Sequence, residues 1–108
     1  MHFDLLARAI DWLDAYRSLS HDVVTMYADD ATIFCGCGSE KALTGRMRVQ
    51  SYWIKRFDEK PAGELVDIDD LGGNVVAVTY RTQADVVRAV LGFDPSTGLI
   101  TVQRCGPV

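Results

Sequence analysis

The sequence predicts an α+β fold, in which a curved antiparallel sheet of four to six strands wraps around three helices from the N-terminal half. Two observations predict it. Apolar residues recur at helical spacing before residue 61, whereas β-branched residues and turn signals fill the remainder of the chain. Helices and strands that are segregated in this way along a chain are typical of α+β proteins. The length of 108 residues fits a single domain over residues 1–108.

The first two predicted helices precede residue 28. Residues 3–18 form the longer helix, and Trp12 lies at the border of its apolar stripe. Several candidate N-cap residues in segment 18–22 precede a short second helix at 23–27. The apolar stripe of the long helix comprises Leu6, Ala9, Ile10, Leu13 and Tyr16.

The third predicted helix follows Thr44-Gly45, with Thr44 as its cap, and ends at segment 61–63. Its apolar face carries Val49, Trp53 and Phe57 at spacing i, i+4, i+8. Met47 and Ile54 flank this face, and the basic residues Arg46, Arg48, Lys55 and Arg56 cover the other side.

The predicted strands cover residues 31–37, 64–69, 75–82, 84–93 and 99–105. Gly72-Gly73-Asn74 is a hairpin signal between the second and third of these strands, and residues 94–98 form a turn before the last. Asp29 and Asp30 are interpreted as residues that turn the chain into the first strand.

Composition excludes several classes of protein. The 11 Lys and Arg residues are outnumbered by 15 Asp and Glu residues, so a nucleic-acid partner is not expected. No apolar run is long enough to cross a membrane, and the N-terminus lacks the basic start of a signal peptide, so a cytoplasmic protein is expected. Cys35, Cys37 and Cys105 cannot all pair internally, and C-x-C without a suitable fourth ligand predicts neither a metal site nor a cofactor.

The segment Tyr27-Ala28-Asp29-Asp30-Ala31-Thr32-Ile33, followed by Gly45 and a helix that bears Trp53, resembles the NTF2-like superfamily. The resemblance is nearest to its SnoaL-like and ketosteroid-isomerase-like members, which share a cystatin-like α+β cone. It implies an apolar pocket at the wide end of the cone and a homodimer through the outer face of the sheet. Isomerases, polyketide cyclases, dehydratases and epoxide hydrolases share this fold with proteins that only bind ligands.

The resemblance does not carry over the catalytic residues of ketosteroid isomerase. Alignment on the same segment places Cys35 at the position of the catalytic base and Ala89 at that of the late-strand Asp. The position of the catalytic Tyr falls near Asp11 or Trp12. Isomerase activity is therefore not expected.

An epoxide-hydrolase-like Asp-Arg-Asp relay would have to use Asp67, Asp85 and Arg88. Neighbouring residues of a strand alternate between faces, so these three side chains are not expected to converge.

The resemblance also implies which residues line a pocket. Two of its polar candidates could transfer protons: Asp11, whose pKa would rise if it were buried, and Tyr80. The implied lining comprises Trp12, Tyr16, Ile33, Cys35, Trp53, Phe57, Val78, Tyr80, Ala89, Leu91 and Gln103.

Three functional hypotheses remain open. The first is a protein that binds a small hydrophobic molecule without catalysis. The second is an isomerase-, cyclase- or dehydratase-type enzyme that uses Asp11 or Tyr80. The third is a non-catalytic homodimerisation module whose own side chains fill the pocket. The dimer interface expected on the outer sheet face comprises Val75, Ala77, Thr79, Arg81, Val86, Val90 and Arg104.

Overall fold

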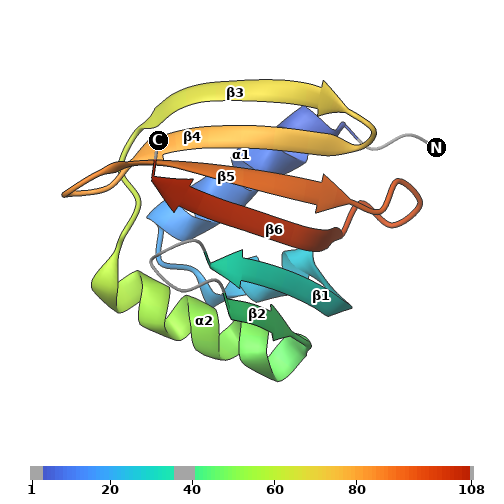
Figure 1. Cartoon of the computed structure of the whole chain (residues 1–108), viewed down its shortest axis with the longest axis horizontal. Helices are drawn as coiled ribbons and strands as arrows, with labels where there is room; N and C mark the ends of the chain where they lie inside the picture. The colour runs from blue at the N-terminus through green and yellow to red at the C-terminus, as the bar shows by residue number, and fades with distance from the viewer. Residues whose placement is uncertain (1–3, 36–40, 108) are drawn as a thin grey trace.

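The computed structural model describes residues 4–35 and 41–107, and these contain three helices and six strands (Figure 1). The helices are α1 (Leu5–Arg17), the 3₁₀ helix η1 (His21–Met26) and α2 (Arg46–Glu59). The strands are β1 (Tyr27–Cys35), β2 (Lys41–Thr44), β3 (Leu65–Gly72), β4 (Val75–Arg81), β5 (Val86–Phe93) and β6 (Ile100–Pro107).

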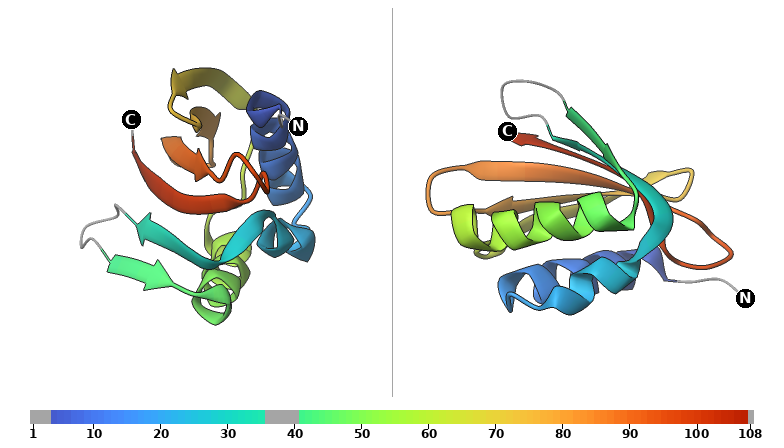
Figure 2. Two further views of the ribbon diagram at one scale, coloured as in Figure 1. Left: turned by 90° about the vertical axis from the view of Figure 1, so that its right-hand side faces the viewer. Right: turned by 90° about the horizontal axis from the view of Figure 1, so that it is seen from below.

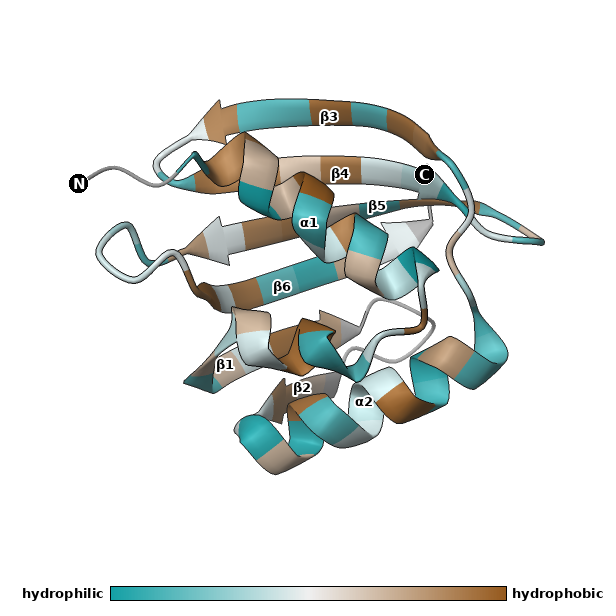
Figure 3. Ribbon diagram, turned by 180° about the vertical axis from the view of Figure 1, so that it is seen from behind, coloured by the Kyte–Doolittle hydropathy of each residue, from teal (hydrophilic) through white to brown (hydrophobic). Residues whose placement is uncertain are grey.

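The six strands form one curved, open sheet in the order β2-β1-β6-β5-β4-β3. The sheet curls around the helices, with α1 packed against β3 and β4 and α2 against β1 and β2 (Figure 2). Seen from behind, α1 and α2 both lie on the same side of the sheet (Figure 3). The predicted α+β architecture is confirmed, with one correction: β1 pairs with β6 in parallel, so the sheet is not wholly antiparallel.

Helix α1 begins where Asp4 caps it by accepting a hydrogen bond of 3.1 Å from the backbone N–H of Ala7. The predicted apolar stripe is displaced. Leu6 and Ile10 are 38 % and 42 % exposed, whereas Trp12, expected at the border, is fully buried. The sheet covers only one side of α1, and its buried face comprises Ala9, Trp12, Leu13 and Tyr16.

Helix α2 begins at Arg46, after Gly45 adopts a φ of +100° that favours glycine. Thr44 does not cap this helix as predicted. It ends β2 instead, with its hydroxyl 2.9 Å from that of Thr32 on β1. Two residues predicted to flank the apolar face, Met47 and Ile54, are 82 % and 53 % exposed.

The strands also differ from the prediction at the start of the sheet. β1 begins at Tyr27, so Asp29 and Asp30 lie within the strand rather than before it. β2 was not expected, and it pairs with β1 as a short antiparallel edge strand. The predicted first strand extended to residue 37, which lies outside the described residues, as does the side chain of Cys35.

Both predicted hairpin turns are confirmed. Gly73 and Asn74 adopt φ values of +61° and +64° between β3 and β4. In the turn between β5 and β6, the Asp94 carboxylate accepts a hydrogen bond of 2.8 Å from the backbone N–H of Ser96. These turns set the register of β3 with β4 and that of β5 with β6.

Candidate functional site

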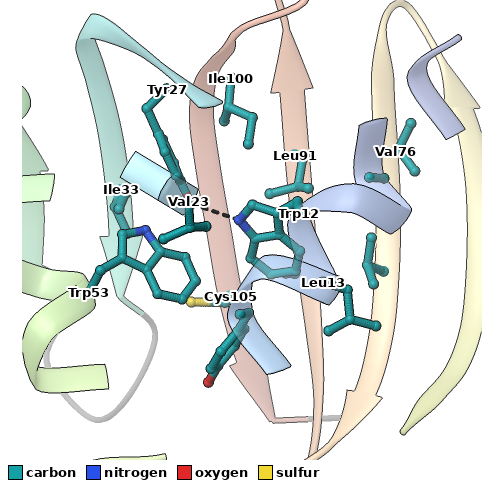
Figure 4. Close-up of a cluster of buried hydrophobic side chains, with 14 of the residues drawn as sticks. Trp12, Leu13, Val23, Tyr27, Ile33, Trp53, Val76, Leu91, Ile100 and Cys105 are labelled. Carbon is teal, nitrogen blue, oxygen red and sulfur yellow. Dashed lines mark hydrogen bonds between the residues drawn. The ribbon is translucent and has the colours of Figure 1, made fainter. Parts of the chain in front are cut away.

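Four aromatic rings meet in the interior between the helices and the sheet, two of them on α1, one on α2 and one on β4. Figure 4 labels two of them, Trp12 and Trp53. The ring centroids of Trp12 and Trp53 lie 5.8 Å apart, and those of Tyr16 and Trp53 lie 4.8 Å apart. Tyr16 and Tyr80 are 5.4 Å apart. All three pairs are edge-to-face, a favourable arrangement for buried rings.

A chain of buried hydrogen bonds runs from Trp12 across the interior. The indole Nε1 of Trp12 donates to the Tyr27 hydroxyl at 2.9 Å, as Figure 4 shows, and that hydroxyl donates to Oε1 of Gln103. Nε2 of Gln103 lies 3.8 Å from Sγ of Cys105, which is 3.5 Å from the Tyr52 hydroxyl. Each of these polar groups is thereby partnered despite its burial.

A second group of polar contacts, which we call the Arg56 cluster, consists of Arg56, Tyr16, Tyr80 and the backbone carbonyl of Lys60. The Arg56 guanidinium donates from Nε to the Tyr16 hydroxyl at 2.8 Å and from Nη2 to the Tyr80 hydroxyl at 3.0 Å. The Tyr16 hydroxyl in turn donates to the carbonyl of Lys60. The cluster therefore joins α1, α2 and β4, at the end of the fold where α2 and β6 finish (Figure 1).

Arg56 is a buried cation without an acidic partner among the described residues. It is 7 % exposed. The ion pairs found in residues 4–35 and 41–107 use other bases, namely Arg17, Arg46, Lys55 and Arg81. Burial alone lowers the pKa of Arg56, but the surrounding tyrosines outweigh this effect and the net shift is upward. The guanidinium is therefore charged at every physiological pH.

The tyrosines around Arg56 are neutral. Burial raises the pKa of Tyr16, and that of Tyr80, above the ordinary value, and the nearby Arg56 only partly opposes this rise. Burial also raises the pKa of Tyr52, and the neighbouring Cys105 adds to the shift. These hydroxyls therefore act as hydrogen-bonding groups, because none of them is an available base near neutral pH.

The structure brings most of the implied pocket lining together. Trp12, Tyr16, Ile33, Trp53, Val78, Ala89 and Leu91 have no exposed surface, and Tyr80 and Gln103 are each 1 % exposed. Phe57 is half-buried beside Tyr16 and Trp53. Because side chains without accessible surface cannot border even a water-sized space, they fill the interior at the positions they occupy.

The acids considered in the sequence lie elsewhere. Asp11 is exposed on α1, and its suggested role as a base depended on burial that this helix face does not provide. Asp67, Asp85 and Arg88 are exposed as well, so they form no relay in the interior.

The sequence reasoning missed Arg56 and Tyr27. Arg56 was grouped with the exposed bases of α2, although it follows Val49 by seven residues and Trp53 by three, and therefore shares their face. Tyr27 was interpreted as the end of a helix, whereas it starts β1 and is buried.

No three His, Cys, Asp or Glu side chains in the described part of the chain are grouped so that they could hold a metal ion. None of the helices within residues 4–35 and 41–107 has the length and apolar character needed to cross a membrane.

Neither a family model nor a curated protein matches this sequence, so similarity rests on solved structures. A SnoaL-like protein of unknown function from Burkholderia thailandensis has a TM-score of 0.81 at 18 % identity, covering 100 % of this chain and 98 % of the other. This chain has the SnoaL-like fold. SalBIII, an epoxide hydrolase/cyclase-like enzyme with a role in pyran ring formation in the polyether salinomycin, has a TM-score of 0.74 at 19 % identity. That match covers 93 % of this chain and 87 % of SalBIII.

At these identities the similarity establishes the SnoaL-like fold alone, because one fold can support many activities. The interior of this SnoaL-like chain holds a buried arginine and a set of neutral tyrosines. No described carboxylate lies within ion-pairing distance of the arginine.

Proposed function

We propose that this SnoaL-like chain binds a small hydrophobic molecule beside the Arg56 cluster and does not catalyse the ketosteroid isomerase reaction. The observation that carries the proposal is Arg56 itself, 7 % exposed and held by two neutral tyrosine hydroxyls. Arg56 has no counter-ion in residues 4–35 and 41–107, and such a buried cation does not help folding, because a well-packed apolar residue avoids its desolvation cost. A few fixed polar groups within an apolar interior are, however, typical of ligand sites.

The filled interior limits the size of the ligand. Trp12 and Trp53 occupy the space between α1, α2 and the sheet, and neither has accessible surface. The rings of Tyr52 and Phe57, both on α2, are half-buried and pack against the core. A ligand of one or two rings that packs on Tyr52 and Phe57 suits these surroundings, whereas a molecule of steroid size would require the tryptophans to move.

The similarity to SalBIII, an epoxide hydrolase/cyclase-like enzyme with a role in pyran ring formation, supports a small molecule as the class of ligand. A catalytic role for this chain has less support. Asp11 is exposed, and the raised pKa of Tyr80 makes its hydroxyl a poor base. Binding without turnover is therefore the function that the site supports best.

A thermal-shift screen of the purified protein against a few hundred uncharged planar compounds of one or two rings tests the proposal. Mass spectrometry of compounds released on denaturation accompanies it. Binding at a hundredfold excess over Kd stabilises by about 3 kcal/mol, which is a shift of several degrees in Tm. Phe57→Ala should weaken the response, and Asp11→Asn, an exposed control, should leave it unchanged. The proposal would be contradicted if the screen found no stabilising compound and mass spectrometry found no released one.

The second candidate is a homodimerisation module with a self-filled interior. The specific observation in its favour is the complete burial of Trp12, Tyr16 and Trp53 within one subunit. Such a protein would dimerise and show no response to any compound of the screen. Light scattering together with the screen therefore separates the two candidates.

A further inference from the structure

We propose that the Arg56 cluster is a carboxylate-binding subsite and that the ligand is a small monocarboxylate with an aromatic or other apolar body. This inference rests on the proposed function and gives the ligand its chemical class. It follows from charge, from hydrogen-bonding geometry and from the surroundings of one side chain.

Arg56 has no counter-ion among the residues that the structure describes. Removing a guanidinium from water costs several kcal/mol, and a paired anion offsets this desolvation cost. A buried guanidinium that lacks a paired anion keeps the full cost. No described carboxylate lies within 4.0 Å of Arg56, and its two hydrogen-bond partners are neutral. One bound monoanion would neutralise the site, whereas a doubly charged phosphate would leave an excess negative charge in an apolar interior.

Arg56 keeps N–H donors that bond to none of the described residues. A guanidinium has five N–H groups, of which Nε and one N–H of Nη2 are used by Tyr16 and Tyr80. The two N–H groups of Nη1 donate to none of the described residues. Within the described part of the chain, the Nη1–Nη2 edge therefore has no partner, and two parallel N–H groups match the two oxygens of a carboxylate.

The tyrosines hold this edge in place before any ligand binds. The Tyr16 hydroxyl accepts from Nε and is itself anchored on the Lys60 carbonyl, and the guanidinium carbon lies 5.9 Å from the centre of the Tyr16 ring. Tyr80 fixes Nη2 from the sheet side. Since the planar guanidinium is held by Tyr16 and Tyr80 on two different elements, little side-chain entropy is lost when an anion binds.

The surroundings define the rest of the ligand. Phe57 lies one residue after Arg56 on α2, with its ring 6.3 Å from that of Tyr16 and 5.5 Å from that of Trp53. Tyr52, one turn earlier on the same helix, is also half-buried. An acid with an aromatic ring next to its carboxylate could place the ring against Phe57 while its charge meets Arg56.

Benzoate and its neutral isostere benzamide provide the test. Both are titrated into the wild-type protein at pH 7 and constant ionic strength, with Tm and Kd as readouts. We expect benzoate to bind at least tenfold more tightly than benzamide. Arg56→Met should remove this preference and retain the weak benzamide response. Arg46→Met is the control, because Arg46 is an exposed arginine of α2 that pairs with Asp29 of β1. This variant should behave like the wild type.

Equal affinity for benzoate and benzamide would overturn the carboxylate assignment, as would a benzoate preference that survives in Arg56→Met. A lack of response to both compounds would overturn it too. The proposed function is judged separately, by the screen of uncharged compounds, so its failure is distinguishable. Arg56→Lys serves as a second variant, because it keeps the charge without the paired N–H edge. We expect it to lose most, though not all, of the preference for benzoate.

Discussion

The replacement Arg56→Met tests whether Arg56 serves the site or the fold. It removes two hydrogen bonds from a charged donor, each worth about 1.5–3 kcal/mol, so about 3–6 kcal/mol is lost. It also removes the desolvation cost of a guanidinium that is 7 % exposed, which amounts to several kcal/mol. The two effects nearly cancel, and methionine fills much of the vacated volume. We expect the free energy of unfolding to change by less than about 2 kcal/mol.

Urea unfolding followed by tryptophan fluorescence measures this change, because Trp12 and Trp53 are both buried and become exposed on unfolding. Trp53→Ala provides the scale, since truncation of a buried aromatic residue costs about 3–5 kcal/mol. A loss of about 4 kcal/mol or more in Arg56→Met would refute the reasoning. It would show that Arg56 is required for folding and is not an expendable, uncompensated charge.

Three further predictions concern stability and assembly. The raised pKa values of Tyr16, Tyr27, Tyr52 and Tyr80 mean that above pH 10 the unfolded chain releases protons that the folded chain retains. Below pH 10 these tyrosines should make no contribution to the pH dependence of the free energy of unfolding. Above pH 10 the free energy of unfolding should fall by up to about 1.4 kcal/mol per pH unit for each tyrosine. Urea midpoints measured between pH 9 and 12 should show this fall, and a flat profile would contradict the burial of these hydroxyls. Gly45→Ala forces a φ of +100° on a residue with a side chain, so it should lower the free energy of unfolding by about 1–2 kcal/mol. An unchanged urea midpoint in Gly45→Ala would be evidence against that backbone strain. The outer sheet face, where Arg104 lies 4.2 Å from the ring centre of Phe34, should mediate a homodimer. Light scattering should give twice 11.9 kDa, and Arg104→Glu should halve that mass. A wild-type monomer at high micromolar concentration would exclude this interface.

Apart from β2, the order of helices and strands was predictable because local patterns determine it. The resemblance implied that Val78, Ala89 and Gln103 face inward, and all three are buried, in keeping with the alternation of side chains along a strand. The two hairpin turns could also be predicted, since Gly and Asn adopt the positive φ values that such turns require.

The remainder depended on contacts between distant segments. The parallel pairing of β1 with β6 joins residues about 70 positions apart, and no local signal specifies it. The burial of Arg56 is of the same kind. A base on a helix is usually solvated, and only the arrival of Tyr16 and Tyr80 from other elements provides acceptors for it. The key residue of the candidate site was therefore visible in the sequence, but its environment was not.

The most direct test of small-molecule binding beside Arg56 is an NMR titration of the ¹⁵N-labelled protein with a compound from the screen. Few side-chain signals need to be assigned, because the chain has only two tryptophans. We predict that the largest chemical-shift changes occur at the Arg56 Nε–H, the Trp53 indole N–H and the Phe57 amide. Changes confined to residues of the outer sheet face, such as Val90 and Arg104, would contradict the assignment of the site.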